Sequence, residues 1–216
     1  MTELRYTLLS DGSSDRMLLH ILTWLLSSHL SNWAIQAEWA NLGKLPQPPK
    51  TLPDKIKTSL ELYPCDLLFV HRDAENESRN KRISEIHEAV KQTGESVHIP
   101  VICVVPIRMT EAWLLFDENA IRRAAENPNG RQSLQLPNLS IIEQLPDPKN
   151  ELCQILRQAS GFTGRRLKQF KAREREKIQR LAELIDDFSQ LNVLSAFQAL
   201  DADIRNVIQT EGWKIE

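Results

Sequence analysis

Carboxylate side chains follow two apolar, strand-like segments of this 216-residue chain. The segment RYTLLSDGSSD ends in Asp11 and Asp15, and the later segment CDLLFVHRDAE ends in Asp73 and Glu75. In open parallel α/β sheets, ligands gather at the carboxyl ends of the strands, where loops leave the rigid sheet. We therefore expect these acids to meet at one functional site.

The spacing of the acids predicts a metal site. Asp73 and Glu75 lie two residues apart, so in an extended segment their side chains face the same way and can share one hard cation. Asp11, from the neighbouring predicted strand, completes a set of oxygen ligands. Such a set suits Mg²⁺ or Mn²⁺, which prefer carboxylate and water ligands and leave positions open for phosphate oxygens. The sequence therefore predicts Mg²⁺ or Mn²⁺ bound by Asp11, Asp73 and Glu75.

Other charged residues near the same strand ends have two interpretations each. An Asp after a strand often caps a helix, and Asp15, in the first turn of a predicted helix, is interpreted mainly in this way. Glu111 stands at the start of another predicted helix, where it either complements the helix dipole or binds a second metal. Arg72 and Arg108 either contact phosphate or neutralise the acids, and Arg72 can also pair with acidic neighbours.

Strands and helices alternate over roughly the first 126 residues. Predicted strands cover residues 4–10 and 66–70 and lie within HIPVICVVPIRM and, more weakly, WAIQAEWANL. Predicted helices begin near residues 14, 51, 79 and 110, with a serine cap on the first and Thr110 capping TEAWLLFDENAIRRAAE. Alternation of this kind predicts βαβ units, and hence an α/β fold with a mainly parallel sheet and helices on both faces.

Strand signals end after NPNGRQSLQLPN, and residues 149–209 have a helical pattern. We expect an α/β domain over residues 1–130 and a helical C-terminal extension, residues 131–216, packed on it. The long segment RRLKQFKAREREKIQR is strongly basic. It is either a solvated helix face or a surface that binds nucleic-acid phosphates without sequence preference. The candidate nucleic-acid-binding residues are Arg165, Arg166, Lys168, Lys171 and Arg173.

Three motifs resemble the Toprim domain, which primases, topoisomerases and OLD-family nucleases share. LLSDGSSDRMLLHIL, DLLFVHRDAE and VVPIRMTEAWLLFD are similar, in this order, to small bacterial Toprim-related proteins over about residues 4–126. The resemblance implies a Toprim-like fold and a Mg²⁺-dependent nuclease or related phosphoryl-transfer enzyme. Asp73 and Glu75 would then hold the metal, while Asp11 would be a further ligand or a general base.

The chain departs from the Toprim pattern at two positions. Asp11 stands in place of the Toprim glutamate, and Glu75 in place of the second acid of the Asp-x-Asp pair. Both replacements keep a carboxylate but move the ligand oxygens, and small misplacements of reacting groups are costly for catalysis. A Toprim-derived scaffold that has lost catalysis and binds a protein partner is therefore the alternative expectation.

Composition and the family resemblance bear on the location and the partners of this protein. A net charge of −2 gives no ground for a general attraction to nucleic acid. No segment has the pattern of a signal peptide or membrane helix, so we expect a cytoplasmic protein. We expect Trp24, Trp39 and Trp113 in the core. Toprim-related proteins of this size often accompany an ABC or AAA-type ATPase in bacterial defence against phage. The resemblance thus implies such a partner, since this sequence has no P-loop of its own.

Overall fold

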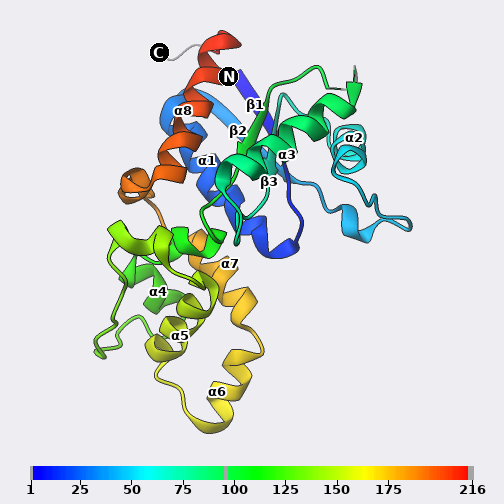
Figure 1. Ribbon diagram of the computed structural model, residues 1–216. Helices are drawn as coiled ribbons and strands as arrows, with labels where there is room; N and C mark the ends of the chain where they lie inside the picture. The colour runs from blue at the N-terminus through cyan, green and yellow to red at the C-terminus, as the bar shows by residue number, and fades with distance from the viewer. Residues whose placement is uncertain (1, 95–96, 214–216) are drawn as a thin grey trace.

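The computed structural model describes residues 2–94 and 97–213. Its four strands form one sheet in the order β2-β1-β3-β4, and every pair is parallel (Figure 1). The strands are β1 (Thr2–Leu9), β2 (Trp33–Trp39), β3 (Leu67–His71) and β4 (Val101–Val104). Since β1 and β3 occupy the centre of the sheet, all of β3 and the second half of β1 are buried on both faces. The predicted α/β fold with a parallel sheet is confirmed.

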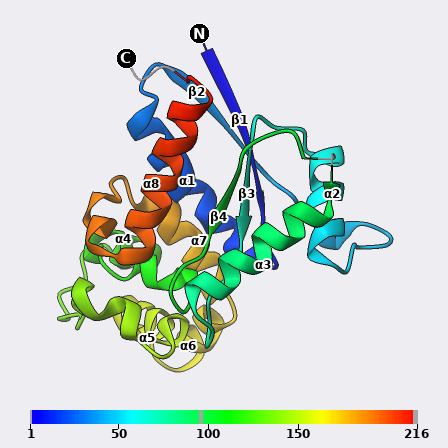
Figure 2. The same ribbon diagram turned by 45° about the horizontal axis from the view of Figure 1, so that its top comes forward.

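Helices cover both faces of this sheet, also as predicted. The α-helices of the described residues are α1 (Leu18–His29), α2 (Leu52–Leu62), α3 (Arg79–Gln92), α4 (Glu118–Ala124), α5 (Pro148–Ser160), α6 (Gly164–Lys171), α7 (Glu174–Leu184) and α8 (Ser195–Thr210). Short 3-10 helices cover Ser13–Met17, Leu42–Lys44, Thr110–Leu114, Leu139–Gln144 and Ser189–Val193. Helices α2 and α3 lie on one face of the sheet, and α1 and α8 lie on the other (Figure 2).

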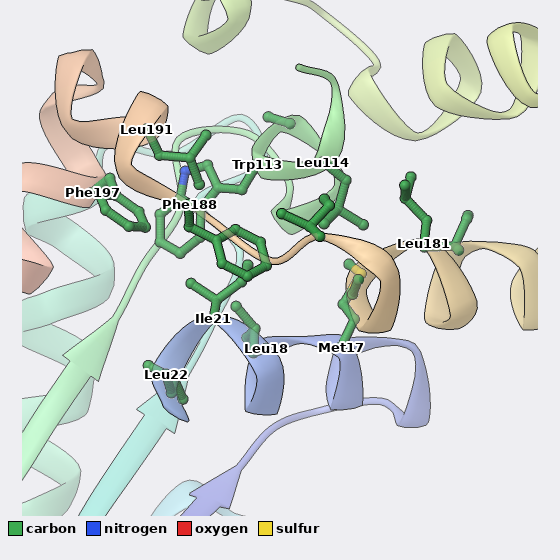
Figure 3. Close-up of a cluster of buried hydrophobic side chains, with 14 of the residues drawn as sticks. Met17, Leu18, Ile21, Leu22, Trp113, Leu114, Leu181, Phe188, Leu191 and Phe197 are labelled. Atoms are coloured by element: carbon green, nitrogen blue, oxygen red, sulfur yellow. The ribbon is translucent and has the colours of Figure 1, made fainter. Parts of the chain in front are cut away.

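The larger hydrophobic core joins the first helix to the C-terminal helices. Figure 3 shows Ile21 of α1 pointing toward Trp113, Phe188 and Phe197, which come from later parts of the chain. Trp113 is buried, and its ring meets that of Phe197 edge to face at 5.4 Å. The residues of the expected helical extension therefore share one core with the sheet. None of the described helices has the length and apolar character needed to cross a membrane.

Several details of the predicted elements are wrong. The first helix starts as a 3-10 turn with Gly12 at its N-cap, and the carboxylate of Asp15, rather than a serine, bonds back to the Gly12 N–H. The single helix expected from Thr110 is a 3-10 turn followed by α4, which begins afresh at its Asp117 cap. Thr110 caps neither, since its hydroxyl faces His71 and Asp73.

The basic segment is helical, as expected, but it is not continuous. It forms α6 and α7, which are separated by a turn at Ala172 and Arg173. Beyond β4 the described residues form helices and loops without another strand, as predicted. Trp24 and Trp39 pack against the larger core but are only partly buried, so of the three tryptophans expected in the core only Trp113 is fully enclosed.

Candidate functional site

A buried histidine lies between two carboxylates at the carboxyl edge of the sheet. His71 is the last residue of β3, and its side chain is 2% exposed. Its Nε2 lies 3.2 Å from Asp73 Oδ1, and its Nδ1 lies 3.5 Å from Asp15 Oδ2, an ion-pair distance. Asp15 follows β1, so the parallel pairing of β1 with β3 brings the two acids to the same edge. We call Asp15, His71, Asp73 and Thr110 the inner cluster.

Thr110 ties the inner cluster to the loop after β4. Its backbone N–H donates to Asp73 Oδ1 over 3.0 Å, and its hydroxyl donates to the same oxygen over 3.1 Å. Thr110 Oγ1 is also 3.0 Å from His71 Nε2. One carboxylate oxygen of Asp73 thus meets three polar hydrogens, which fixes its position more firmly than a single contact would.

The charges within the inner cluster are coupled. Burial would lower the pKa of His71, but the hydrogen bonds and charges of Asp15 and Asp73 raise it to about 9. The imidazole is therefore a cation at neutral pH. Burial opposes ionisation of Asp15, yet His71 and the N–H of Gly12 hold the pKa of Asp15 below its usual range. The cluster is thus an anion–cation–anion arrangement held inside the protein.

Glu111 lies beside the inner cluster and opens onto a cavity. The cavity measures 480 Å³ and is lined by Glu111, Lys149 and Arg175 together with the 12–14 loop. Burial raises the pKa of Glu111, the nearby charge of Asp73 acts in the same direction, and Lys149 Nζ opposes both from 3.3 Å. A carboxyl group with a raised pKa in a cavity is a candidate acid–base group. We call this space the Glu111 cavity.

Cys153 also lines the Glu111 cavity, but its thiol is not activated for reaction. Burial raises the pKa of its thiol to about 11, with smaller contributions of the same sign from Glu174. A thiol with such a pKa is protonated at neutral pH and is a poor nucleophile. Cys153 is therefore a part of the cavity wall rather than a reacting group.

The outermost predicted acid, Asp11, belongs to a separate ion-pair network. Its side chain is 52% exposed, and its oxygens lie 2.7 Å from Lys55 Nζ and 3.6 Å from Arg72 Nε. Arg72 also donates to Glu85 over 2.7 Å, so the interpretation of Arg72 as a partner of neighbouring acids is confirmed. A second cavity, of 760 Å³, lies against Asp11, Lys44 and Lys55.

Glu75 points into solvent because of its backbone conformation. Its φ is 53°, in the left-handed region, and its side chain is 62% exposed and 3.7 Å from Arg82. Arg108, at φ 67°, donates to the backbone oxygen of Glu75 and, over 2.9 Å, to Asn76 Oδ1. The extended segment that would align Glu75 with Asp73 therefore ends before Glu75. In this structure Arg108 therefore holds the loop after β3 in place.

The expected metal set can be compared with these contacts. Within residues 2–94 and 97–213, no group of three or more His, Cys, Asp or Glu side chains is arranged to hold a metal ion. Asp11, Asp73 and Glu75 each face a cation of the protein itself. In this arrangement the three side chains do not fit one shared ion. Binding of Mg²⁺ or Mn²⁺ stays a prediction, and no step proposed below passes through a metal.

The basic candidates lie on the protruding helix α6 and the turn after it (Figure 1). All five are exposed, and within the described residues only Arg173 has an ion pair, at 2.9 Å from Glu176. The chain passes directly from α6 into α7, whose Arg175 reaches the Glu111 cavity. The unpaired cations of α6 are Arg165, Arg166, Lys168 and Lys171.

Sequence reasoning found part of this site and missed its centre. Asp73 and Glu111 lie where they were expected, at the sheet edge. Asp15 was interpreted as a cap, which it is, but it is also a partner of His71. A signal was available, because His71 and Asp73 lie two residues apart at the end of a strand. Lys149 had no local motif that could reveal it.

Comparison with known proteins adds no identification. No protein-family model, curated protein or solved structure matches this chain at a significant level. The functional assignment therefore depends on the fold and on the geometry of the site.

Proposed function

We propose that this chain is a phosphoryl-transfer enzyme, most simply a nuclease, that acts on nucleic acid and has a Toprim-like fold. One observation carries the proposal: Glu111, Lys149 and Arg175 share a cavity beside Asp73 and its buried partner His71. The cavity thus combines an acid–base carboxyl group with two cations that suit phosphate oxygens. The three sequence motifs that resemble Toprim proteins support the same class of reaction.

The proposed chemistry assigns one role to each group. Lys149 and Arg175 hold the phosphate oxygens, and the ionised Glu111 accepts a proton from the attacking water. The water oxygen forms a bond to phosphorus, the bond from phosphorus to the leaving oxygen breaks, and the proton passes to that oxygen. Asp73 and His71 position the start of the Thr110 turn, which carries Glu111. The expectation of Mg²⁺ or Mn²⁺ comes from the acids at the strand ends and from the Toprim resemblance, and the assay below tests it.

Cleavage of labelled oligonucleotides tests the activity. Single- and double-stranded DNA and RNA are incubated with the protein in Mg²⁺, in Mn²⁺ and in EDTA. Glu111→Gln removes the acid–base group, and Asp73→Asn removes the charge that positions the turn. Glu111→Gln is expected to lower the rate by about a hundredfold or more, the scale of a general acid–base group. Asp73→Asn is expected to lower it by up to about a hundredfold, because it misplaces the turn that carries Glu111.

The matched control is Glu77→Gln, because Glu77 is an exposed acid of the loop after β3 whose side chain, among the described residues, forms an ion pair with Lys81 alone. Its cleavage rate is expected to equal that of the wild type. Equal rates in all four proteins, or no cleavage with any substrate and any cation, would contradict the proposal.

Binding of nucleic acid by α6 is a separable part of the proposal. Each phosphate contact that is lost is expected to reduce the slope of log affinity against log salt by about 1. Arg165→Gln and Lys168→Gln should each show this reduction, whereas Arg180→Gln, whose arginine already pairs with Glu183 at 2.7 Å, should not. If the salt slope is the same in all variants, α6 is not part of the binding surface.

A second candidate function is a scaffold without catalysis that binds an ABC or AAA-type ATPase, as in bacterial defence against phage. The observation that favours it is the pairing of each predicted metal ligand with a cation of the protein. Titration with Mn²⁺, followed by calorimetry, separates the candidates. Binding that Asp73→Asn abolishes favours the enzyme. No binding, together with a stable complex with the ATPase, favours the scaffold.

A further inference from the structure

A groove with two tryptophans lies on the other side of the 12–14 loop from the Glu111 cavity. It has a volume of 690 Å³, and its walls come from α1, β2 and α7. This volume is within the usual range for small-molecule sites. Trp24 of α1 and Trp39 of β2 line the groove, and both are only partly buried. We call it the tryptophan groove.

The two indole rings are held in place by the rest of the protein. Trp24 meets the ring of Phe188 edge to face at 5.9 Å, and Trp39 donates its N–H to Ser10 Oγ over 3.1 Å. Rings that are already fixed lose little conformational entropy when a planar ligand stacks on them. His20 lies one helical turn before Trp24 on the same side of α1, and burial lowers the pKa of its imidazole. At neutral pH the groove thus offers uncharged aromatic surfaces.

Polar groups at the rim connect the groove to the candidate active site. Ser13 and Gln179 line both the tryptophan groove and the Glu111 cavity. Gln179, from α7, also donates to the backbone oxygen of Ser14 over 2.5 Å, so Gln179 and the 12–14 loop form a boundary that the two spaces share. Arg16 and Glu183 stand at the outer rim of the groove. A ligand with a phosphate in one space can therefore extend an aromatic group into the other.

We propose that the tryptophan groove binds an unpaired nucleobase of a single-stranded nucleic acid whose phosphodiester lies in the Glu111 cavity. This inference rests on the proposed function and names its substrate class. Stacking on an aromatic side chain accepts any base because every base has a π-face. A duplex cannot supply the base without extruding it, which costs unpairing and unstacking energy. The groove thus selects single strands over duplexes.

Binding is measured in EDTA by fluorescence anisotropy of labelled oligothymidylate and of a duplex of equal length, and gel electrophoresis of both probes afterwards shows that neither has been cleaved. The first variant, Ala37→Glu, places a larger, charged side chain at an exposed position of the groove wall without removing a core contact. The control, Gln36→Glu, adds the same charge one residue earlier, where strand alternation turns the side chain to the opposite face of β2. The second variant, Trp24→Leu, removes a stacking surface.

The wild type is expected to bind the single strand at least tenfold more tightly than the duplex. Ala37→Glu and Trp24→Leu should each weaken single-strand binding roughly tenfold, the scale of one stacked base, and Gln36→Glu should weaken it less than twofold. Should Trp24→Leu unfold, which circular dichroism would reveal, Ala37→Glu decides alone. Equal affinities for single strand and duplex, or equal effects of Ala37→Glu and Gln36→Glu, would overturn the inference.

The two proposals can fail independently. If Ala37→Glu weakens single-strand binding but no cleavage occurs under any condition, base binding in the tryptophan groove is supported and the nuclease proposal is contradicted. Cleavage that Glu111→Gln abolishes, with wild-type binding by Ala37→Glu, supports the nuclease and overturns the groove. An apolar fluorescent dye that occupies the groove and is not displaced by oligothymidylate would also overturn the inference, and would favour an apolar peptide as the occupant.

Discussion

The inner cluster and the ion pairs around Asp11 lie at the same sheet edge but differ in burial. His71 is 2% exposed and touches two carboxylates, whereas Asp11 is 52% exposed and shares its charge with Lys55 and Arg72. Water screens the outer pairs, so each contributes little to stability. The inner cation is removed from water, so the two carboxylates beside it must compensate its charge. Acids that look alike in the sequence therefore have different physical roles.

Removing the inner cation provides the strongest test of this difference. His71→Gln leaves Asp15 and Asp73 without the cation between them, and breaking such a buried set costs on the order of 3 kcal/mol. Lys55→Gln, the outer counterpart, is expected to cost less than about 1 kcal/mol. Urea unfolding at pH 7 measures both values. Similar losses in the two variants would remove the distinction between the regions.

The same cluster predicts a dependence of stability on pH. The pKa of His71 is raised from 6.5 to about 9, so protonated His71 stabilises the folded state fully below pH 6.5. This contribution, on the order of 3 kcal/mol, is lost as the pH rises through about 9. The difference in unfolding free energy between wild type and His71→Gln is therefore expected to shrink from pH 6.5 to pH 10. A constant difference over this range would mean that His71 is neutral when folded.

Thr110 tests the hydrogen bonds of the inner cluster without changing its charge. Thr110→Val keeps the shape of the side chain but removes the hydroxyl that bonds Asp73 and His71, at an expected cost of about 1–2 kcal/mol. Thr163→Val, at an exposed threonine whose hydroxyl caps no helix, should change stability by less than about 0.5 kcal/mol. Thermal unfolding compares them, and equal midpoints would argue against an energetic role for the Thr110 hydroxyl.

The smallest predicted effect is a gain in stability from a substitution at Glu75, in the outer, exposed region. Glu75 has a left-handed backbone at φ 53°, which glycine adopts without strain, so Glu75→Gly should raise the unfolding free energy by up to about 1 kcal/mol. Glu77→Gly, nearby in the same loop but not at positive φ, should instead lower it by about 0.5–1 kcal/mol. Urea midpoints distinguish the two signs. Loss of stability in Glu75→Gly would show that its contact with Arg82 outweighs the strain.

Local patterns account for the elements of this protein. The strands predicted at residues 4–10 and 66–70 correspond to the two central strands, β1 and β3, and α3 begins at Arg79 as expected. Loop details were harder, because a side chain that caps a turn in one context bonds a distant residue in another. Thr110 shows this, since the hydroxyl expected to cap a helix bonds His71 and Asp73 instead.

The sequence by itself determined the class of the fold and the acids at the strand ends, since both follow from hydrophobic periodicity and from where each strand stops. Only the tertiary structure decided which acids act together. The parallel pairing of β1 with β3 brings Asp15 to His71, and the left-handed turn at Glu75 sends that carboxylate into solvent. The physical reason is that coupling between charges depends on distance and burial through space, and neither is encoded in the spacing of residues along the chain.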